Sequence, residues 1–510
     1  MPHHPPAQPN TETAYVPHQA YAALALVAFG VFVAADDLTV ISTMLPQMIF
    51  DFEIPLPAGL DDASWIVSSY LITHIVAMPL LGRVSDLYGR RILFIGCMVI
   101  FAIGSLLVAQ ASTLNILIAA RVVQAIGGGG VVPVAMAVVG DLFPPARRAW
   151  ALGLLGAVDT LGWIIGPLYG AFWVRYFTWP WQFYINIPIS LLAVIGAWLL
   201  LPDDGHSQHG HRHRLDWSGA LTLSLALVLI NVGLASGGGH MATGPSFDFA
   251  AANPAPTWPK MMAYLSGGGL ALLIFVWLEH RTAQPLIDLR MFRATNFSVA
   301  CLLNFVVGLA LITAMVNVPL FVNAVLASGS TLDDYLKAAA VESGQILTAL
   351  TVAMAATSVL GGWLCSRLGY RTPLAAGLLL ISAGFGLMNG WSPAVTYGAM
   401  AWQLALAGAG FGLVTAPVGT VVINAVAAEV RGIASGLMLI LRLMGMSVGL
   451  SSLTAWGLYR FEILSLPYSI AEIGQHLQAI TAQILTETFL AVAILTLGVT
   501  VTTLLIQTKK

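Results

Sequence analysis

The sequence predicts an all-α polytopic membrane protein, on the strength of its composition, its long apolar runs and the placement of its basic residues. The chain has 510 residues, of which 58% are hydrophobic and only 9% are charged. A soluble domain carries about 25% charged residues, so that class is excluded. The apolar runs also exceed the roughly 10-residue alternating strands of a membrane barrel, which favours helices.

Fourteen apolar segments are predicted as membrane-spanning helices, since a span needs about 20 mostly apolar residues. Their approximate limits are residues 20–48, 64–82, 92–109, 113–139, 149–171, 184–202, 216–236, 261–279, 296–322, 340–364, 372–390, 395–424, 432–456 and 485–507. Residues 1–18 are polar and lack the basic region of a signal peptide, so we expect the first span to be retained.

Basic residues gather on one side of this topology. Arg121 and Arg442 lie within spans, and most other Lys and Arg residues fall in loops of one side. The loops of the other side hold Arg175, Lys260, Lys337 and Arg460. Because cytoplasmic loops carry an excess of Lys and Arg, both termini are predicted to be cytoplasmic, in the cell membrane, with an even number of spans. The formal net charge of −2 gives no indication of nucleic-acid binding.

Several chemistries have no pattern in this sequence. No Gly-x-x-x-x-Gly-Lys-Ser/Thr loop occurs, so ATP is not expected as the energy source. Cys97, Cys301 and Cys365 fall within or at the end of spans, and no pair has a disulfide or metal spacing. We therefore expect no catalytic residues, no cofactor and no metal site.

A short basic turn joins the second and third predicted spans. Residues 82–91 read Gly-Arg-Val-Ser-Asp-Leu-Tyr-Gly-Arg-Arg, in which Gly82 and Gly89 permit a tight turn. A weaker copy at 362–371 keeps both glycines and the last arginine, but Ser366 replaces the aspartate. Such an internal repeat predicts two homologous helix bundles.

The repeat divides the chain into two six-helix bundles and an inserted pair of helices. The predicted parts are a cytoplasmic tail at 1–19, a bundle at 20–202, a linker with two inserted spans at 203–295, a bundle at 296–507 and a cytoplasmic tail at 508–510. Four linker histidines could chelate a metal, although a solvated connector is favoured. They are His206, His209, His211 and His213.

Ionisable residues inside the spans are the first candidates for function, because each costs roughly 2.5–3.5 kcal/mol to insert. The candidates are Asp36, Asp37, Arg121, Asp159, Arg442 and, more weakly, His74. Asp36 and Asp37 are neighbours on one helix and point about 100° apart, so they cannot both face one cavity.

Four motifs together resemble the major facilitator superfamily of transporters. They are the 82–91 turn, Asp37-Leu38-Thr39 leading to Leu45-Pro46, Arg121-x-x-Gln124, and Gly162-x-x-x-Gly166-Pro167-x-x-Gly170. Within the superfamily the chain is most similar to the fourteen-span drug:proton antiporters of the EmrB/QacA type. The resemblance implies a major facilitator fold, with two six-helix bundles and two inserted helices. Asp36 stands where the antiporter pattern usually has an apolar residue.

The resemblance implies that Asp37 couples proton movement to substrate movement. Burial disfavours the charged form of a carboxyl group, so Asp37 could load a proton outside and release it inside. A purely structural role for Asp37 is the alternative. Arg121 could adjust this proton exchange, or it could pair with Asp36 and hold the bundle together.

Two further features have open interpretations. Asp159 is either a second proton or cation site or a partner of His74 at similar depth. Glycines every fourth position let a neighbouring helix approach closely. The resemblance places Gly162, Gly166, Pro167 and Gly170 at the interface between the bundles.

The 82–91 turn is expected to act as a gating loop. Asp86 is a plausible partner of Arg90, or of a helix end in the other bundle, and such a clasp would hold the inner gate closed. Alternatively, Arg90 and Arg91 serve only the orientation of the chain in the membrane.

The function expected from these features is proton-coupled export of small amphipathic or cationic compounds, such as drugs, by alternating access. One alternative keeps the fold and exports a lipid, siderophore or natural product. Another is a non-transporting membrane receptor or scaffold. The expected partners are a small-molecule substrate, protons and the lipid bilayer. A periplasmic adaptor stays an open option, and no nucleic acid is expected.

Overall fold

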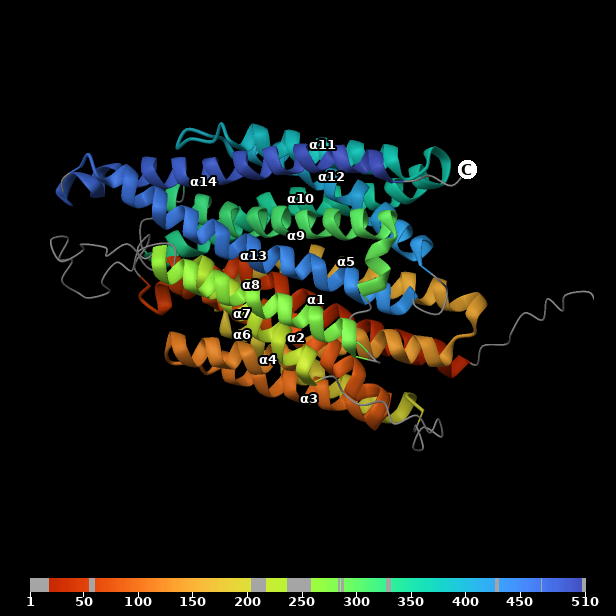
Figure 1. The fold of residues 1–510 in the computed structure, drawn as a ribbon. Helices are drawn as coiled ribbons and strands as arrows, with labels where there is room; N and C mark the ends of the chain where they lie inside the picture. Colours follow the sequence, from red (N-terminus) through yellow and green to blue (C-terminus); the bar gives the residue numbers. More distant parts are fainter. Residues whose placement is uncertain are drawn as a thin grey trace, which may run out of the picture.

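The computed structural model describes residues 18–54, 60–202, 217–235, 258–282, 285, 289–326, 332–426, 431–468 and 470–506. Across these residues the chain forms α-helices and no strand (Figure 1). The helices of the first half are α1 (His18–Asp51), α2 (Leu60–Tyr88), α3 (Arg90–Ala109), α4 (Leu114–Leu142), α5 (Pro145–Tyr176), α6 (Pro180–Leu200), α7 (Trp217–Ala235) and α8 (Trp258–Arg281). Those of the second half are α9 (Thr295–Phe321), α10 (Leu332–Leu368), α11 (Arg371–Met388), α12 (Tyr397–Ala425), α13 (Arg431–Ser465) and α14 (Ile470–Thr500).

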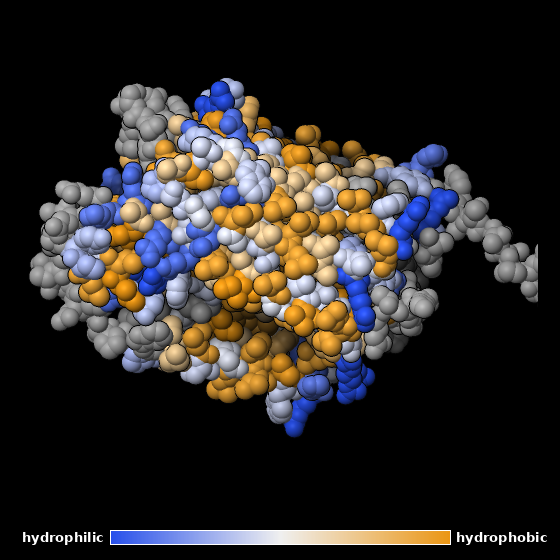
Figure 2. All heavy atoms as spheres, turned by 90° about the horizontal axis from the view of Figure 1, so that it is seen from above, coloured by the Kyte–Doolittle hydropathy of each residue, from blue (hydrophilic) through white to orange (hydrophobic). Residues whose placement is uncertain are grey.

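The predicted fold class is confirmed. Of the helices in the described part of the chain, 13 are long and apolar enough to cross a membrane. In α7 the apolar stretch is shorter, at Ser218–Ile230. Figure 2 shows a broad hydrophobic band around the middle of the molecule and hydrophilic residues toward both ends. That distribution fits a protein whose middle lies in the hydrocarbon layer. The His-rich part of the linker lies outside the described residues.

The helices pack as two groups, which we call the first bundle (α1–α6) and the second bundle (α9–α14) (Figure 1). In the first bundle α1 packs against α4, α5 and α6, and in the second α9 packs against α12, α13 and α14. The two bundles meet where α2 contacts α13 and where α5 contacts α10. The α7–α8 pair packs onto the first of these seams, through contacts of α7 with α2 and α13.

The same local devices recur in both bundles at what we call the loop end, the end that carries Gly89 and Gly369. These two glycines have φ values of 92° and 76°, a region that other residues rarely adopt. The arginine two residues later then binds a carbonyl near the last helix of its own bundle: Arg91 donates to Trp198 and Arg371 to Ile506, each over 2.5 Å. These repeated contacts support the internal repeat seen in the sequence.

At the opposite end, which we call the hairpin end, α13 and α14 continue beyond the length of a membrane span. Their 35 and 31 residues exceed the roughly 20 that a span needs. A separate small apolar cluster of Phe461, Ile480 and Ile484 holds this extension together. At the hairpin end, α13 and α14 therefore extend the wall of the space between the two bundles.

Candidate functional site

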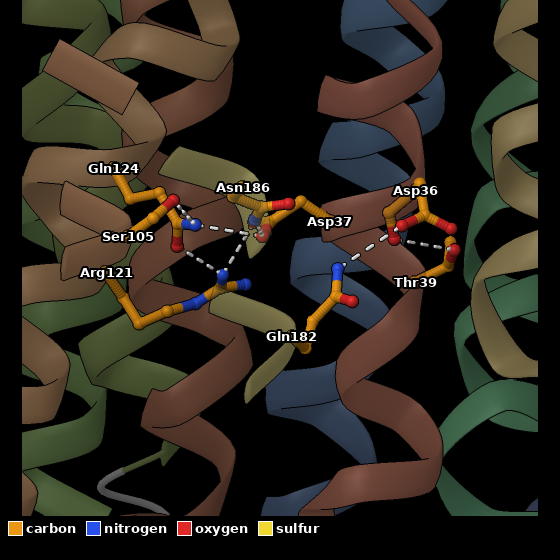
Figure 3. Close-up of polar contacts among 8 residues, drawn as sticks. All are labelled: Asp36, Asp37, Thr39, Ser105, Arg121, Gln124, Gln182 and Asn186. Atoms are coloured by element: carbon orange, nitrogen blue, oxygen red, sulfur yellow. Dashed lines mark hydrogen bonds and ion pairs between the residues drawn. The ribbon is translucent and has the colours of Figure 1, made fainter. Parts of the chain in front are cut away.

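Asp37 lies at the centre of a fully buried polar cluster in the first bundle (Figure 3). Nη1 of Arg121 donates to its Oδ2 over 2.8 Å, which forms a buried ion pair. Oδ1 accepts from Nε2 of Gln124 over 2.9 Å and from Nδ2 of Asn186 over 3.1 Å. Helices α1, α4 and α6 thus meet at one carboxylate, and both of its oxygens are hydrogen-bonded.

Neighbouring residues fix the groups that hold Asp37. Arg121 and Gln124 are three residues apart on α4, so they share a face and bond to each other over 2.7 Å. Gln124 also donates to Ser105 of α3 over 2.8 Å. The guanidinium of Arg121 lies 4.0 Å from the ring centre of Tyr70, a cation–π contact that stabilises its charge. Contacts with α1, α2 and α3 thus hold Arg121 and Gln124 in place, and within the described residues Nε of Arg121 has no hydrogen-bond partner.

Asp36 points away from this cluster, as Figure 3 shows. Its carboxyl is 5% exposed, and its Oδ2 accepts one long hydrogen bond of 3.5 Å from Nε2 of Gln182. Its Oδ1 has no hydrogen-bond partner. The two adjacent aspartates thus occupy different environments, as their angular separation on the helix requires. Arg121 pairs with Asp37, so the alternative that it pairs with Asp36 is wrong.

The glycine motif of α5 packs α5 against α1, which belongs to the same bundle. A Cβ added to Gly162, Gly166 or Gly170 would lie 2.7 Å or less from Ala35, Thr39 or Thr43 respectively. The carbonyl of Pro167 accepts a hydrogen bond of 3.1 Å from Thr43. The three glycines therefore serve the α1–α5 contact and not the expected interface between bundles. The physical reason is that their face of α5 points to α1, and the inter-bundle contact lies nearby, at Ala171 against Gly344 of α10.

Asp159 and His74 both line a small void between the bundles, of about 10 Å³. Leu439 and Leu443 of α13 close it from the second bundle. The charge of Arg442 on α13 acts on Asp159, and Nε of Arg442 donates to Asn304 of α9 over 3.2 Å. Asp159 therefore faces an opposite charge across the seam, in addition to lying near His74.

The gating loop is anchored within the first bundle. Nε of Arg90 donates to Asp141 of α4 over 3.0 Å, and its Nη1 donates to Ser85 over 2.5 Å. The guanidinium of Arg91 also stacks on the Trp198 ring at 4.3 Å. Gly82 packs against Pro133 of α4. The side chain of Asp86 lies outside the described residues, so its clasp with Arg90 stays a prediction.

A cavity of about 380 Å³ opens between the bundles toward the hairpin end. Helices α1, α2, α9, α13 and α14 line it, mostly with apolar residues such as Leu45 and Leu450. Among the described lining residues the polar groups are few, and include Asn317, Gln478 and Thr488. None of these described lining residues is acidic or basic. Asp37 does not line this cavity, because α1 reaches the cavity only from Leu45 onward, about 12 Å further along the helix.

Sequence reasoning missed three members of the polar clusters. Ser105, Gln182 and Asn186 were not among the predicted site residues, yet they contact Gln124, Asp36 and Asp37. The sequence contains a pattern that could have indicated two of these residues. Gln182 and Asn186 are four residues apart in an otherwise apolar helix, which places both amides on one face.

Comparison with known proteins gives a consistent assignment. The sequence profile of the Major Facilitator Superfamily matches residues 27–450. A triacylglyceride transporter of Mycobacterium tuberculosis is 32% identical, covering 96% of this chain and 95% of the relative. A triacylglyceride transporter of Mycolicibacterium hassiacum is 33% identical over 78% of this chain and 72% of its own. Multidrug resistance protein 3 of Bacillus subtilis is 29% identical over 75% and 69%.

Solved structures show the same fold. A bacterial homolog of the human lysosomal transporter Spinster, in an inward-facing and occupied conformation, superposes with a TM-score of 0.61. The match is 17% identical and covers 96% of this chain and 97% of that one. The xylose transporter XylE from E. coli superposes with a TM-score of 0.55 at 14% identity, over 93% and 98%. These relatives and neighbours are transporters and not enzymes.

Proposed function

Because the chain belongs to the Major Facilitator Superfamily of transporters, we propose that it is a proton-coupled exporter of a neutral, lipid-like compound. The observation that carries this proposal is the cavity at the hairpin end, which is large and mostly apolar, and whose described lining residues carry no charge. An apolar site with a few uncharged polar groups suits an acyl chain with ester or hydroxyl groups. The names of the mycobacterial relatives support the same substrate class.

Proton coupling is proposed for the buried carboxylates of α1. A carboxylate inside a membrane bundle marks a proton or ion path by default. Asp37 is joined to α4 and α6 through Arg121 and Asn186, so protonation of Asp37 would release both helices from α1. The hairpin end of α1 lines the cavity. A shift of α1 on protonation of Asp37 would therefore reach the substrate although Asp37 itself does not contact it. We also propose that the protein lies in the cell membrane with both termini in the cytoplasm.

Export of cationic drugs is the second candidate, supported by the Bacillus relative. A cationic substrate normally needs an acidic partner, because an unpaired charge in an apolar site is costly. The polar groups that the described residues offer to the cavity are amides and hydroxyls. We therefore favour a neutral substrate. A measurement of flux decides between a transporter and a receptor or scaffold without transport.

The test uses purified protein in liposomes with an acidic lumen and a triacylglycerol labelled with a dithionite-quenchable dye. We expect labelled lipid to move to the protected inner leaflet, and an uncoupler to stop this movement. Ethidium in the same vesicles should not accumulate. Transport of ethidium with no movement of lipid would support the drug exporter, and no flux of either probe would support the receptor.

The first prediction concerns Asp37. Asp37→Asn should abolish proton-driven movement of the labelled lipid, because an amide cannot exchange the proton. Asp51→Asn is the matched control, since Asp51 is on the same helix but bonds to Trp179 at the hairpin end, away from the Asp37 cluster. Full proton-driven transport by Asp37→Asn would contradict the mechanism.

A further inference from the structure

We infer that Asp36 and Gln182 form a second proton-binding site, separate from the Asp37–Arg121 pair. The proton binds the carboxyl of Asp36 and is stabilised by the carboxamide of Gln182. The inference rests on the proposed proton coupling and extends it, because two carboxyl groups then take part in place of one.

The contact between the side chains of Asp36 and Gln182 lacks one hydrogen-bond donor. Asp36 is 5% exposed and Gln182 is fully buried. They meet through a single hydrogen bond of 3.5 Å from Nε2 of Gln182 to Oδ2 of Asp36. Oδ1 of Asp36 and Oε1 of Gln182, both buried acceptors, have no partner. A protonated carboxyl group is a hydrogen-bond donor, so one proton on Asp36 supplies the donor that is missing between these two oxygens. A buried acceptor without a donor destabilises the protein.

The surrounding charges lead to the same conclusion. The carboxylate of Asp37 acts on Asp36 as a like charge, and on α5 the phenol of Tyr169 also interacts with Asp36. In the described part of the chain no ion pair involves Asp36, whereas Arg121 is committed to Asp37. Asp36 and Asp37 are adjacent buried carboxyl groups, and only one cation, Arg121, compensates their charge within the described residues. Ionising both groups would therefore cost free energy. The first proton therefore binds Asp36, while Asp37 keeps its negative charge beside Arg121 until the second proton arrives.

The position of Asp36 lets the bundles control access to this proton. A Cβ added to Gly162 or Gly166 of α5 would lie 3.0 Å from the backbone of Asp36, so α5 covers this part of α1. The same helix α5 contacts α10 of the second bundle. Movement of α5 during a transport cycle therefore uncovers Asp36. In each cycle a water-borne proton binds the carboxylate on one side and leaves to water on the other, and no other bond changes.

The test is infrared difference spectroscopy of the full-length protein in lipid nanodiscs between high and low pH. We expect a carbonyl-stretch band of a protonated carboxylic acid that is present in the wild type and retained in Asp37→Asn. The band should be lost in Asp36→Asn and shifted in Gln182→Leu, which removes the amide. An unchanged band in Asp36→Asn would overturn the inference.

A second measurement separates this inference from the proposed function. In vesicles containing a pH-sensitive dye, Asp36→Asn should halve the number of protons moved per labelled lipid while lipid movement continues. An unchanged ratio would overturn the inference. If the wild type moves no lipid, the proposed function fails, but the infrared band still decides whether Asp36 holds a proton. If Asp36→Asn does not fold, a band in Gln182→Leu identical to that of the wild type would overturn the inference.

Discussion

The two neighbouring aspartates of α1 show how one helical step separates two chemical roles. Asp37 receives three donors, one of which is the Arg121 cation, so its charge is compensated. Asp36, turned about 100° away, meets one amide and no cation. One carboxyl of this pair thus has a cation as its partner, and the other has a single long hydrogen bond. Neither side chain faces lipid, since both are buried.

Removing the cation should destabilise the fold more than removing the whole pair. Arg121→Met leaves Asp37 buried and unpaired, which we expect to cost about 3–5 kcal/mol. Arg121→Met with Asp37→Leu should recover much of that loss, because no charge is then left without a partner. Thermal unfolding of the purified variants checks this, with Asp37→Leu alone completing the double-mutant cycle. Additive losses would contradict the pairing.

Part of the residue-scale site could be predicted from the sequence. The equal depth of Asp37 and Arg121 in their spans indicated that they could meet, and they do. Depth gives no rotation about a helix axis, so the partner of Arg121 could equally have been Asp36. The contribution of Ser105 could not be predicted, because a single serine in an apolar helix usually bonds to its own backbone.

At the scale of the helices, the contact of α1 with α5 positions the proton-binding segment. The glycines of α5 allow backbone contact: a Cβ added to Gly166 would lie 1.9 Å from Oγ1 of Thr39, and one added to Gly170 would lie 2.2 Å from Oγ1 of Thr43. Without side chains at these positions, Asp36 is pressed against α5. In a membrane, where lipid competes equally for apolar surface, such close packing is a main source of helix association.

Gly166→Ala should therefore push α5 away from α1. We expect a loss of about 1–3 kcal/mol, typical of overpacking, and a lower melting temperature of the purified protein. Gly156→Ala is the matched control on the same helix, because a Cβ added there meets nothing within 4 Å. It should be neutral or stabilising by up to about 1 kcal/mol. Equal melting temperatures for the two variants would show that the α1–α5 contact is not tight.

The sequence located the helices well but misjudged some of their ends. The expected span 432–456 is part of α13, which continues to Ser465, and the expected span 485–507 is preceded by a helical segment that begins at Ile470. Apolar runs end where the bilayer ends, whereas backbone hydrogen bonding continues as long as the residues tolerate a helix. Hydropathy therefore reports the membrane boundary and not the helix boundary.

For the whole molecule, the arrangement of cavity and seams favours alternating access. The cavity lies between the bundles at the hairpin end, while α5 and α10 touch near Ala171 and Gly344. The seam between α2 and α13 is covered by α7, so α5–α10 is the seam without inserted helices. If the two bundles rock about the cavity, the contacts at the α5–α10 seam and at the α2–α13 seam would separate in turn.

Tying α5 to α10 should stop transport. Cysteines at Ala171 and Gly344 would lie close enough to bond after a small adjustment, because a Cβ at Gly344 would be 2.4 Å from that of Ala171. In a background without Cys97, Cys301 and Cys365, we expect oxidation to form the disulfide and to abolish movement of the labelled lipid. A reductant should restore the rate, since the bundles can then separate.

The control disulfide joins two helices of one bundle. A Cβ at Gly384 of α11 would lie 2.8 Å from that of Ala407 of α12, both far from the seams in the second bundle. Oxidation of Gly384→Cys with Ala407→Cys should leave transport unchanged, because the bundle moves as a unit. Full transport with the Ala171–Gly344 pair oxidised would mean that this seam stays closed throughout the cycle. The bundles would then have to open at the α2–α13 seam alone, with α7 and α8 moving aside.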